Sequence, residues 1–423
     1  MAAVVPEPAV PTVRRPVALR VLNGVVGALR RVGLPVVRLD LDALVARAIR
    51  QTGLDDFGDG AFREPLRRLL DAFEHEARLT LLGRVIARTD VVRLLANRLR
   101  MTDVRRRHPE IDAGAIPRPI VIVGLPRTGT TILHELMAQD PANRVPMTWE
   151  VMHPWPPPER ATYETDPRIA EVERHFAGVE RLIPGFRSMH PMGARLPQEC
   201  VALTAHDFAT MLFSTTHDVP TYQAWLDAAD LRWVYASHRR QLQYLQWRCP
   251  AERWVLKSPG HLWALDALLA VYPDACLVHT HRDPLKVVAS LGSLVALLRA
   301  LASDHVDRVA VGNEWTERLA DGLARATVVR DRGLPPTASV IDVHFKDFMR
   351  DEVGTVRRIY EHFGLDFTPE AESRMRRYLA ANPQDRHGRH RYTLAAAGLQ
   401  EAEERRRYAT YAERFGVVPE SAD

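Results

Sequence analysis

Lysine and cysteine are scarce in this chain of 423 residues. The only lysines are Lys257, Lys286 and Lys346, so 54 of the 57 basic residues are arginines. A lysine retained in such a chain marks a position where a compact point charge matters, because arginine is not an equivalent substitute there. The three cysteines are scattered, which argues against a disulfide framework and favours a reducing compartment.

The chain also has little net charge, since 57 basic and 53 acidic residues leave +4. This balance argues against a nucleic-acid binder with a dominant basic surface. No segment reaches the roughly 20 uninterrupted apolar residues of a membrane helix, and the arginine-broken N-terminal segment is not a secretory signal. Histidines and carboxylates show no metal-ligand spacing. We therefore expect a cytoplasmic protein with no transmembrane segment, no nucleic-acid partner and no metal.

Short apolar segments alternate with helical patterns in the second half of the chain. Strands are predicted at 120–123, 253–256, 276–280 and 339–343, each followed by a helix. This alternation is typical of an α/β fold in which helices cover both faces of a parallel sheet.

Three regions are predicted from the distribution of these elements. They are an N-terminal helical region packed on the core (1–112), the α/β core (113–367) and a C-terminal helical tail (368–423). The core carries a helical insertion at about 151–248, which is a candidate lid over the substrate or a surface addition.

The segment Gly124-Leu-Pro-Arg-Thr-Gly-Thr-Thr131 follows the first predicted strand. A glycine-bounded loop between a strand and a helix directs successive backbone N–H groups at one point, and the helix N-terminus adds positive potential. Gly124 and Gly129 have the spacing of the nucleoside-triphosphatase loop, but Thr130 stands where that loop has its lysine. The segment therefore predicts an anion site for a nucleotide and disfavours an ATP-dependent kinase.

This segment resembles the 5′-phosphosulfate loop of sulfotransferases that use 3′-phosphoadenosine 5′-phosphosulfate (PAPS). The arginine form of the loop is closer to the tyrosylprotein and bacterial branches than to the cytosolic steroid and phenol branch, which has lysine there. The resemblance implies a P-loop-like three-layer fold. It also implies that the 5′-phosphate and the sulfonate are bound by Pro126, Arg127, Thr128, Gly129, Thr130 and Thr131.

A second anion site is predicted in Val278-His-Thr-His-Arg-Asp-Pro-Leu-Lys-Val-Val-Ala-Ser290. A helix is expected to begin near Pro284, because proline suits the first turn. Arg282 and Ser290 are similar in type and spacing to the family's arginine and serine that bind the 3′-phosphate of PAPS. The resemblance thus implies that side chains and helix ends, without a metal, hold both ends of one nucleotide.

Lys257 directly follows the strand predicted at 253–256 and so stands at its carboxyl end. Ligands of open α/β sheets bind at the carboxyl ends of the strands. The resemblance implies that Lys257 lies near the sulfonate, where it would meet the negative charge developing on the bridging oxygen. Transfer to a hydroxyl also needs a general base. The cytosolic branch has a histidine two residues after the lysine, whereas this chain has Pro259 there.

Four residues are therefore candidates for the general base. Glu150 is favoured, because it lies in the region of the tyrosylprotein branch's glutamate, and a strand over 145–150 would bring it to the ligand edge. The alternatives are His261, which lies four residues after Lys257, and Glu199, which stands at the start of a helix in the insertion. His190 is a further alternative. The basic segment 385–392 is a solvated turn or a further contact to the donor.

These features predict a sulfotransferase that moves a sulfonate from PAPS to a hydroxyl of a small molecule, lipid or sugar. The alternatives are a P-loop nucleotide-binding protein without this activity and an ATP-dependent kinase. The acceptor and the oligomeric state are left open by the sequence, whereas the donor is specified by two motifs in the expected order.

Overall fold

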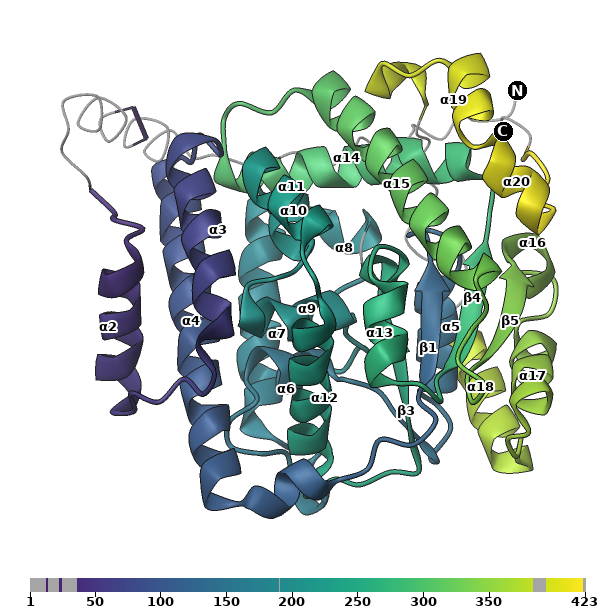
Figure 1. Ribbon diagram of the computed structural model, residues 1–423, viewed down its shortest axis with the longest axis horizontal. Helices are drawn as coiled ribbons and strands as arrows, with labels where there is room; N and C mark the ends of the chain where they lie inside the picture. Colours follow the sequence, from purple (N-terminus) through teal and green to yellow (C-terminus); the bar gives the residue numbers. More distant parts are fainter. Residues whose placement is uncertain (1–12, 14–22, 25–35, 190, 383–392, 421–423) are drawn as a thin grey trace, which may run out of the picture.

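The fold is built on a five-stranded parallel sheet with the strand order β2-β3-β1-β4-β5 (Figure 1). The computed structural model describes residues 13, 23–24, 36–189, 191–382 and 393–420. The strands are β1 (Ile120–Gly124), β2 (Asn143–Arg144), β3 (Arg253–Lys257), β4 (Cys276–His281) and β5 (Ser339–His344). The predicted α/β fold and its four strands are confirmed, and β2 is too short to leave a pattern in the sequence.

Helices cover both faces of the sheet, so β1 is a continuous run of buried residues. Side chains of a strand alternate between the two faces. Ile120 and Ile122 pack with α5 (Thr130–Met137) and α17 (Glu352–Phe363), whereas Val121 and Val123 contribute to the core on the opposite face. That second face is covered by α12 (Arg232–Gln246), α13 (Leu265–Val271), α14 (Pro284–Ala302) and α15 (Arg308–Asp331).

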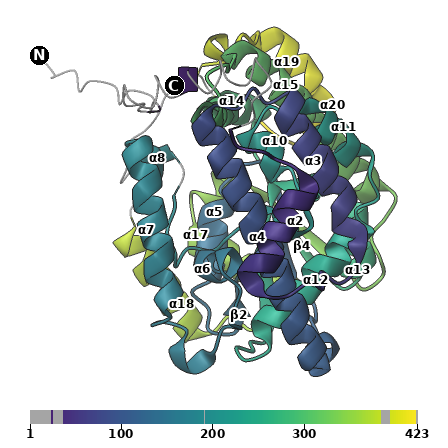
Figure 2. The ribbon, with the colours of Figure 1, turned by 90° about the vertical axis from the view of Figure 1, so that its left-hand side faces the viewer.

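The N-terminal helices share most of their buried side chains with the insertion, whereas Met101 and Val104 at the end of the last of them join the core of the sheet. The helices are α2 (Leu41–Thr52), α3 (Arg63–His75) and α4 (Leu81–Arg107), with the short turns η1 (Gly60–Phe62) and η2 (Pro109–Ala113) (Figure 2). Phe62 and Phe73 belong to the same buried cluster as Phe208 and Tyr222 of the insertion. A buried ion pair of 2.5 Å between Arg98 and Asp207 joins the two regions.

The insertion between β2 and β3 is mostly helical. Its elements are α6 (Thr148–Met152), η3 (Arg160–Thr162), α7 (Pro167–Leu182), α8 (Phe186–Met189), α9 (Cys200–Thr204), η4 (Ala205–Asp207), α10 (Leu212–Thr216), α11 (Pro220–Ala228) and α12. The strand considered over 145–150 does not form. Residues 148–152 are helical instead, because the Glu150 carboxylate accepts the Met147 N–H at 3.0 Å and caps the first turn.

The C-terminal region returns to the sheet. The turn η5 (Pro259–Leu262) directly follows β3, and α16 (Phe345–Phe348) follows β5. After α17 the chain continues through α18 (Pro369–Ala381), η6 (Ala395–Ala397), α19 (Glu401–Arg407) and α20 (Ala409–Phe415). Figure 1 shows α19 and α20, in yellow, beside the end of β4. The Phe415 ring stacks on His281 of β4 with centroids 4.5 Å apart, so the tail is packed near the carboxyl edge of the sheet.

One helix of the described part, α14, is long and apolar enough to cross a membrane by length and composition alone. In the fold, 67% of its most apolar 18-residue window is buried. Its apolar side chains pack in the core with α15 and the sheet. Packing within the protein therefore accounts for its composition.

Candidate active site

The loop between β1 and α5 is shaped by contacts with β4. The Thr128 hydroxyl donates to the Leu125 carbonyl at 2.6 Å and lies 2.7 Å from the Thr280 hydroxyl. Gly124 has φ 155°, and a Cβ placed on it would overlap Thr280 Oγ1. A glycine is needed here because the neighbouring strand approaches this closely.

The N-terminus of α5 is arranged for an anion. Gly129 precedes the helix with φ 83°, and none of the described side chains caps the first N–H groups. These groups, together with the helix dipole, favour a negatively charged ligand. Arg127, also at positive φ, is exposed beside them. Thr130 and Thr131 occupy the first turn, as the loop comparison implied.

The second predicted anion element lies directly against this loop, because β1 and β4 are neighbours in the sheet. Arg282 follows β4, and its Nη1 donates to the Arg127 carbonyl at 2.8 Å. Its guanidinium lies 3.9 Å from the Phe345 ring centroid. Ser290 is two turns along α14, which begins at Pro284 as predicted. Stretches 155 residues apart are thus brought together at one edge.

Lys257 is paired with Glu199 at the end of β3, the strand on the other side of β1. The distance from Lys257 Nζ to Glu199 Oε1 is 2.5 Å. The Lys257 side chain is 5% exposed and that of Glu199 24%, so the carboxylate is the more accessible member. The backbone next to Glu199 is held in place by a hydrogen bond of 2.7 Å from the Gln198 N–H to the Pro146 carbonyl.

Helix α5 places two further titratable groups near Lys257. Burial, together with the Lys257 charge, lowers the pKa of His134 to about 3, so this imidazole is neutral. Burial raises the pKa of Glu135, while a hydrogen bond from Tyr378 at 2.6 Å and the Lys257 charge oppose the rise. The sequence analysis did not identify Glu135, because a polar residue on a helix gives no signal of its own.

Glu150 has a different environment from the one predicted for it. Its side chain is fully buried and forms an ion pair with Arg144 at 2.8 Å. It also accepts from Tyr163 at 3.2 Å. Burial raises the pKa of Glu150, and the Arg144 charge lowers it. A carboxylate without exposed surface is out of reach of an acceptor hydroxyl, so the structure does not support Glu150 as the general base.

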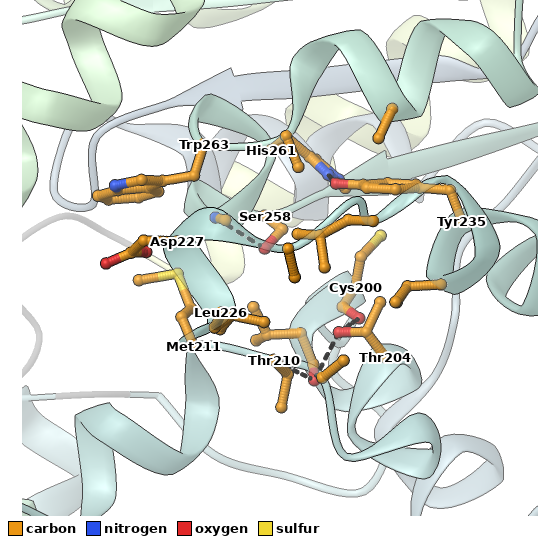
Figure 3. Close-up of a pocket in the computed structure, with 18 of the residues that line it drawn as sticks. Cys200, Thr204, Thr210, Met211, Leu226, Asp227, Tyr235, Ser258, His261 and Trp263 are labelled. Carbon is orange, nitrogen blue, oxygen red and sulfur yellow. Dashed lines mark hydrogen bonds between the residues drawn. The ribbon is translucent and has the colours of Figure 1, made fainter. Parts of the chain in front are cut away.

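His261 faces the core on the α12 and α13 side. Its Nδ1 lies 2.8 Å from the Tyr235 hydroxyl, and burial lowers its pKa to about 3. Figure 3 shows the ring at a cavity of about 100 Å³ that Cys200, Thr204 and Leu226 also line. Lys257 does not line this cavity. His261 is therefore a buried, neutral imidazole beside a cavity that Cys200 and Ser258, the residues next to Glu199 and Lys257, also line. His190 and residues 385–392 lie outside the described residues.

Three residues of the described part, His279, His281 and Asp342, are close enough to share a metal ion. Arg330, however, already pairs with both oxygens of Asp342, and its Nη1 lies 3.2 Å from His279 Nδ1. A cation would have to displace this guanidinium. The group is best described as an ion-pair network that links β4, β5 and α15.

The arrangement defines a class of protein: an α/β enzyme in which a P-loop-like element and a second cationic element meet at the carboxyl edge of a parallel sheet. The model of the sulfotransferase family matches residues 119–369, more than half of the chain. The chain belongs to the sulfotransferase family. This membership supports the sulfotransferase interpretation over the kinase and over a binding protein without catalysis.

Several similar proteins are mycobacterial sulfotransferases. The crystal structure of STF1 from Mycobacterium tuberculosis H37Rv superposes with a TM-score of 0.78 at 35% identity, covering 88% of this chain and 98% of that one. STF9 from Mycobacterium avium superposes with a TM-score of 0.82 at 31% identity, covering 90% and 97%. Omega-hydroxy-beta-dihydromenaquinone-9 sulfotransferase Stf3 of M. tuberculosis is 28% identical over 279 residues, which span 62% of this chain and 66% of Stf3.

Proposed function

We propose that the protein transfers a sulfonate from PAPS to the hydroxyl group of a small-molecule, lipid or sugar acceptor. The observation that carries the proposal is the contact between Arg282 and the Arg127 carbonyl, which puts both predicted anion elements at one site. The Lys257–Glu199 pair stands at the end of the next strand. The donor binds without a metal in this proposal, because arginines and helix N-termini supply the positive field.

PAPS supplies the activated sulfonate. Its 5′-phosphosulfate would lie on the segment Pro126–Thr131, where Thr128 fixes the loop through Leu125 and Thr280. Its 3′-phosphate would lie on Arg282 and Ser290. Arg282 has the fork of donors that matches a phosphate, and its own position is fixed by the Arg127 carbonyl and the Phe345 ring.

Glu199 is the proposed general base. Its carboxylate is partly exposed, and the hydrogen bond from Lys257 orients it. The acceptor oxygen forms a bond to sulfur, the bond from sulfur to the phosphate oxygen breaks, and the hydroxyl proton passes to Glu199. Lys257 would stabilise the negative charge that appears on the departing phosphate oxygen. The products are the sulfate ester and 3′,5′-adenosine bisphosphate.

The acceptor is proposed to be a hydroxyl compound on two grounds. The base and lysine suit deprotonation of an oxygen nucleophile, and the name of the relative Stf3 specifies an omega-hydroxy menaquinone derivative. We also propose a cytoplasmic location, since Cys200, Cys249 and Cys276 are unpaired and buried, in keeping with a reducing compartment.

The test combines ligand binding with turnover. Calorimetry should show that 3′,5′-adenosine bisphosphate binds without magnesium and that ATP with magnesium does not compete. With PAPS and a panel of phenol, sterol, isoprenoid-alcohol and sugar acceptors, at least one sulfate ester should form. Magnesium-dependent ATP binding would favour the kinase. Donor binding with no turnover in any acceptor class would favour a binding protein.

A further inference from the structure

The end of the described chain lies against the proposed donor site. Beyond α20, Gly416 takes φ 61° and the Val417 N–H donates to the Ala412 carbonyl at 2.8 Å, so the chain reverses direction. The Glu420 N–H then donates to Asp283 Oδ2 at 2.8 Å. Asp283 is the residue next to Arg282 and caps α14. The tail thus crosses the start of α14 at the predicted 3′-phosphate position.

Glu420 binds Arg282 with both carboxylate oxygens. Arg282 Nε lies 3.0 Å from Oε1, and Nη2 lies 3.0 Å from Oε2. The third nitrogen, Nη1, donates to the Arg127 carbonyl. Every nitrogen of the guanidinium therefore has a partner, and a phosphate that needs this fork has to displace the carboxylate. The pair is shielded as well, with side-chain exposures of 21% for Arg282 and 15% for Glu420.

The position of Glu420 is fixed by the packing of α20 on β4. The Tyr411 hydroxyl lies 2.9 Å from His281 Nδ1, and the Phe415 ring stacks on the same imidazole. His281 directly precedes Arg282 in the chain. Helix α20 is thus anchored to the residue next to Arg282. Only the short segment after Phe415 has to move for Glu420 to leave the Arg282 guanidinium.

We propose that Glu420 is an internal competitor of the donor: its carboxylate occupies the 3′-phosphate pocket of the empty enzyme and leaves when PAPS binds. The proposal rests on the proposed function, in which Arg282 holds that phosphate. When a site is open in only a fraction of the molecules, the apparent Kd of its ligand equals the Kd of the open site divided by that fraction. Since partly exposed ion pairs are weak, we expect the closed state to weaken donor affinity by only about fivefold.

The experiment measures binding of 3′,5′-adenosine bisphosphate and of 5′-AMP to the full chain by calorimetry. Glu420→Gln removes the charge and keeps the shape, and Glu413→Gln on the exposed face of α20 is the matched control. We expect Glu420→Gln to tighten binding of the bisphosphate about 3- to 10-fold, with 5′-AMP unchanged. Glu413→Gln should bind both nucleotides as the wild type does.

Unchanged or weaker bisphosphate binding by Glu420→Gln would overturn the proposal. Equal tightening of 5′-AMP would overturn it too, because the competition would then not be for the 3′-phosphate. Arg282→Ala separates this proposal from the proposed function. If Arg282→Ala and the wild type bind the bisphosphate equally, the phosphate assignment itself is wrong. A loss in Arg282→Ala without a gain in Glu420→Gln rejects the tail alone.

Discussion

Replacing Glu199 by glutamine tests the catalytic core of the proposed reaction. The amide keeps an oxygen for the Lys257 hydrogen bond at the same 2.5 Å contact but accepts no proton. General-base catalysis contributes roughly 10²- to 10⁴-fold to the rate, so kcat should fall by about that factor, which corresponds to an activation barrier higher by about 3–5 kcal/mol. The affinity for the donor should stay within about twofold, because the glutamate does not hold the donor. The assay is initial-rate release of 3′,5′-adenosine bisphosphate at saturating PAPS, with the donor Kd measured by calorimetry.

Glu135→Gln is the matched control for this experiment. Glu135 is a second carboxyl group near Lys257, but it is bonded to Tyr378 on α18. Removing its charge alters the field at Lys257 without removing a base, so kcat should fall by less than about tenfold. A second readout is the donor Kd, which Glu135→Gln should leave within about twofold of the wild type because neither carboxylate holds the donor in the proposed reaction.

Two outcomes would refute the assignment of Glu199. Glu199→Gln with kcat within tenfold of the wild type would mean that another group takes the proton. An equal loss in Glu135→Gln would mean that both variants act through the charge of Lys257.

Other variants and conditions test the rest of the site and fold. Arg282→Ala removes charge-assisted hydrogen bonds worth about 1.5–3 kcal/mol, so 3′,5′-adenosine bisphosphate should bind about 10- to 100-fold more weakly, with 5′-AMP unaffected in the same titration. Gly124→Ala should lower stability by about 1–3 kcal/mol in a urea melt, because its Cβ would overlap Thr280 Oγ1, whereas Gly178→Ala, with open space around it, should not; equal midpoints would contradict this. Burial lowers the pKa of several histidines from 6.5 to about 3, or to about 4 in one case. Below pH 6.5 the unfolded chain therefore binds more protons than the folded protein does. Each such histidine should lower the free energy of unfolding by about 1.4 kcal/mol per pH unit as the pH falls from 6.5 towards its folded-state pKa. A thermal midpoint that stays constant from pH 7 to pH 5.5 would refute this reasoning. These histidines are His134, His206, His217, His238 and His261.

Local patterns in the chain were enough to predict four of the five strands, together with the loop after β1 and the helix start after β4. A β-branched run, a glycine-bounded loop and a helix start follow one another within 120–131, and each depends on neighbours in the sequence. The same holds for Arg282, since Pro284 marks the start of α14 beside it. Such features are set by backbone preferences over a few residues and need no knowledge of packing.

The four candidates for the general base cannot be ranked from local patterns. Glu150 and Glu199 are both glutamates near a helix start, and they differ only in what surrounds them. One is sealed against Arg144, and the other is brought to Lys257 across 58 residues of chain. Burial and distance decide whether a carboxylate takes a proton, and both are properties of the assembled fold.

The sequence alone thus determined which residue types form the loop after β1 and the order in which the predicted strands follow one another, because short-range geometry dictates both. Only the tertiary structure decided which charges meet. It joined Arg282 to Glu420 over 138 residues and set Lys257 beside Glu199. Charge pairing falls off steeply with separation, so the partner of each side chain is fixed only when the helices have packed on the sheet.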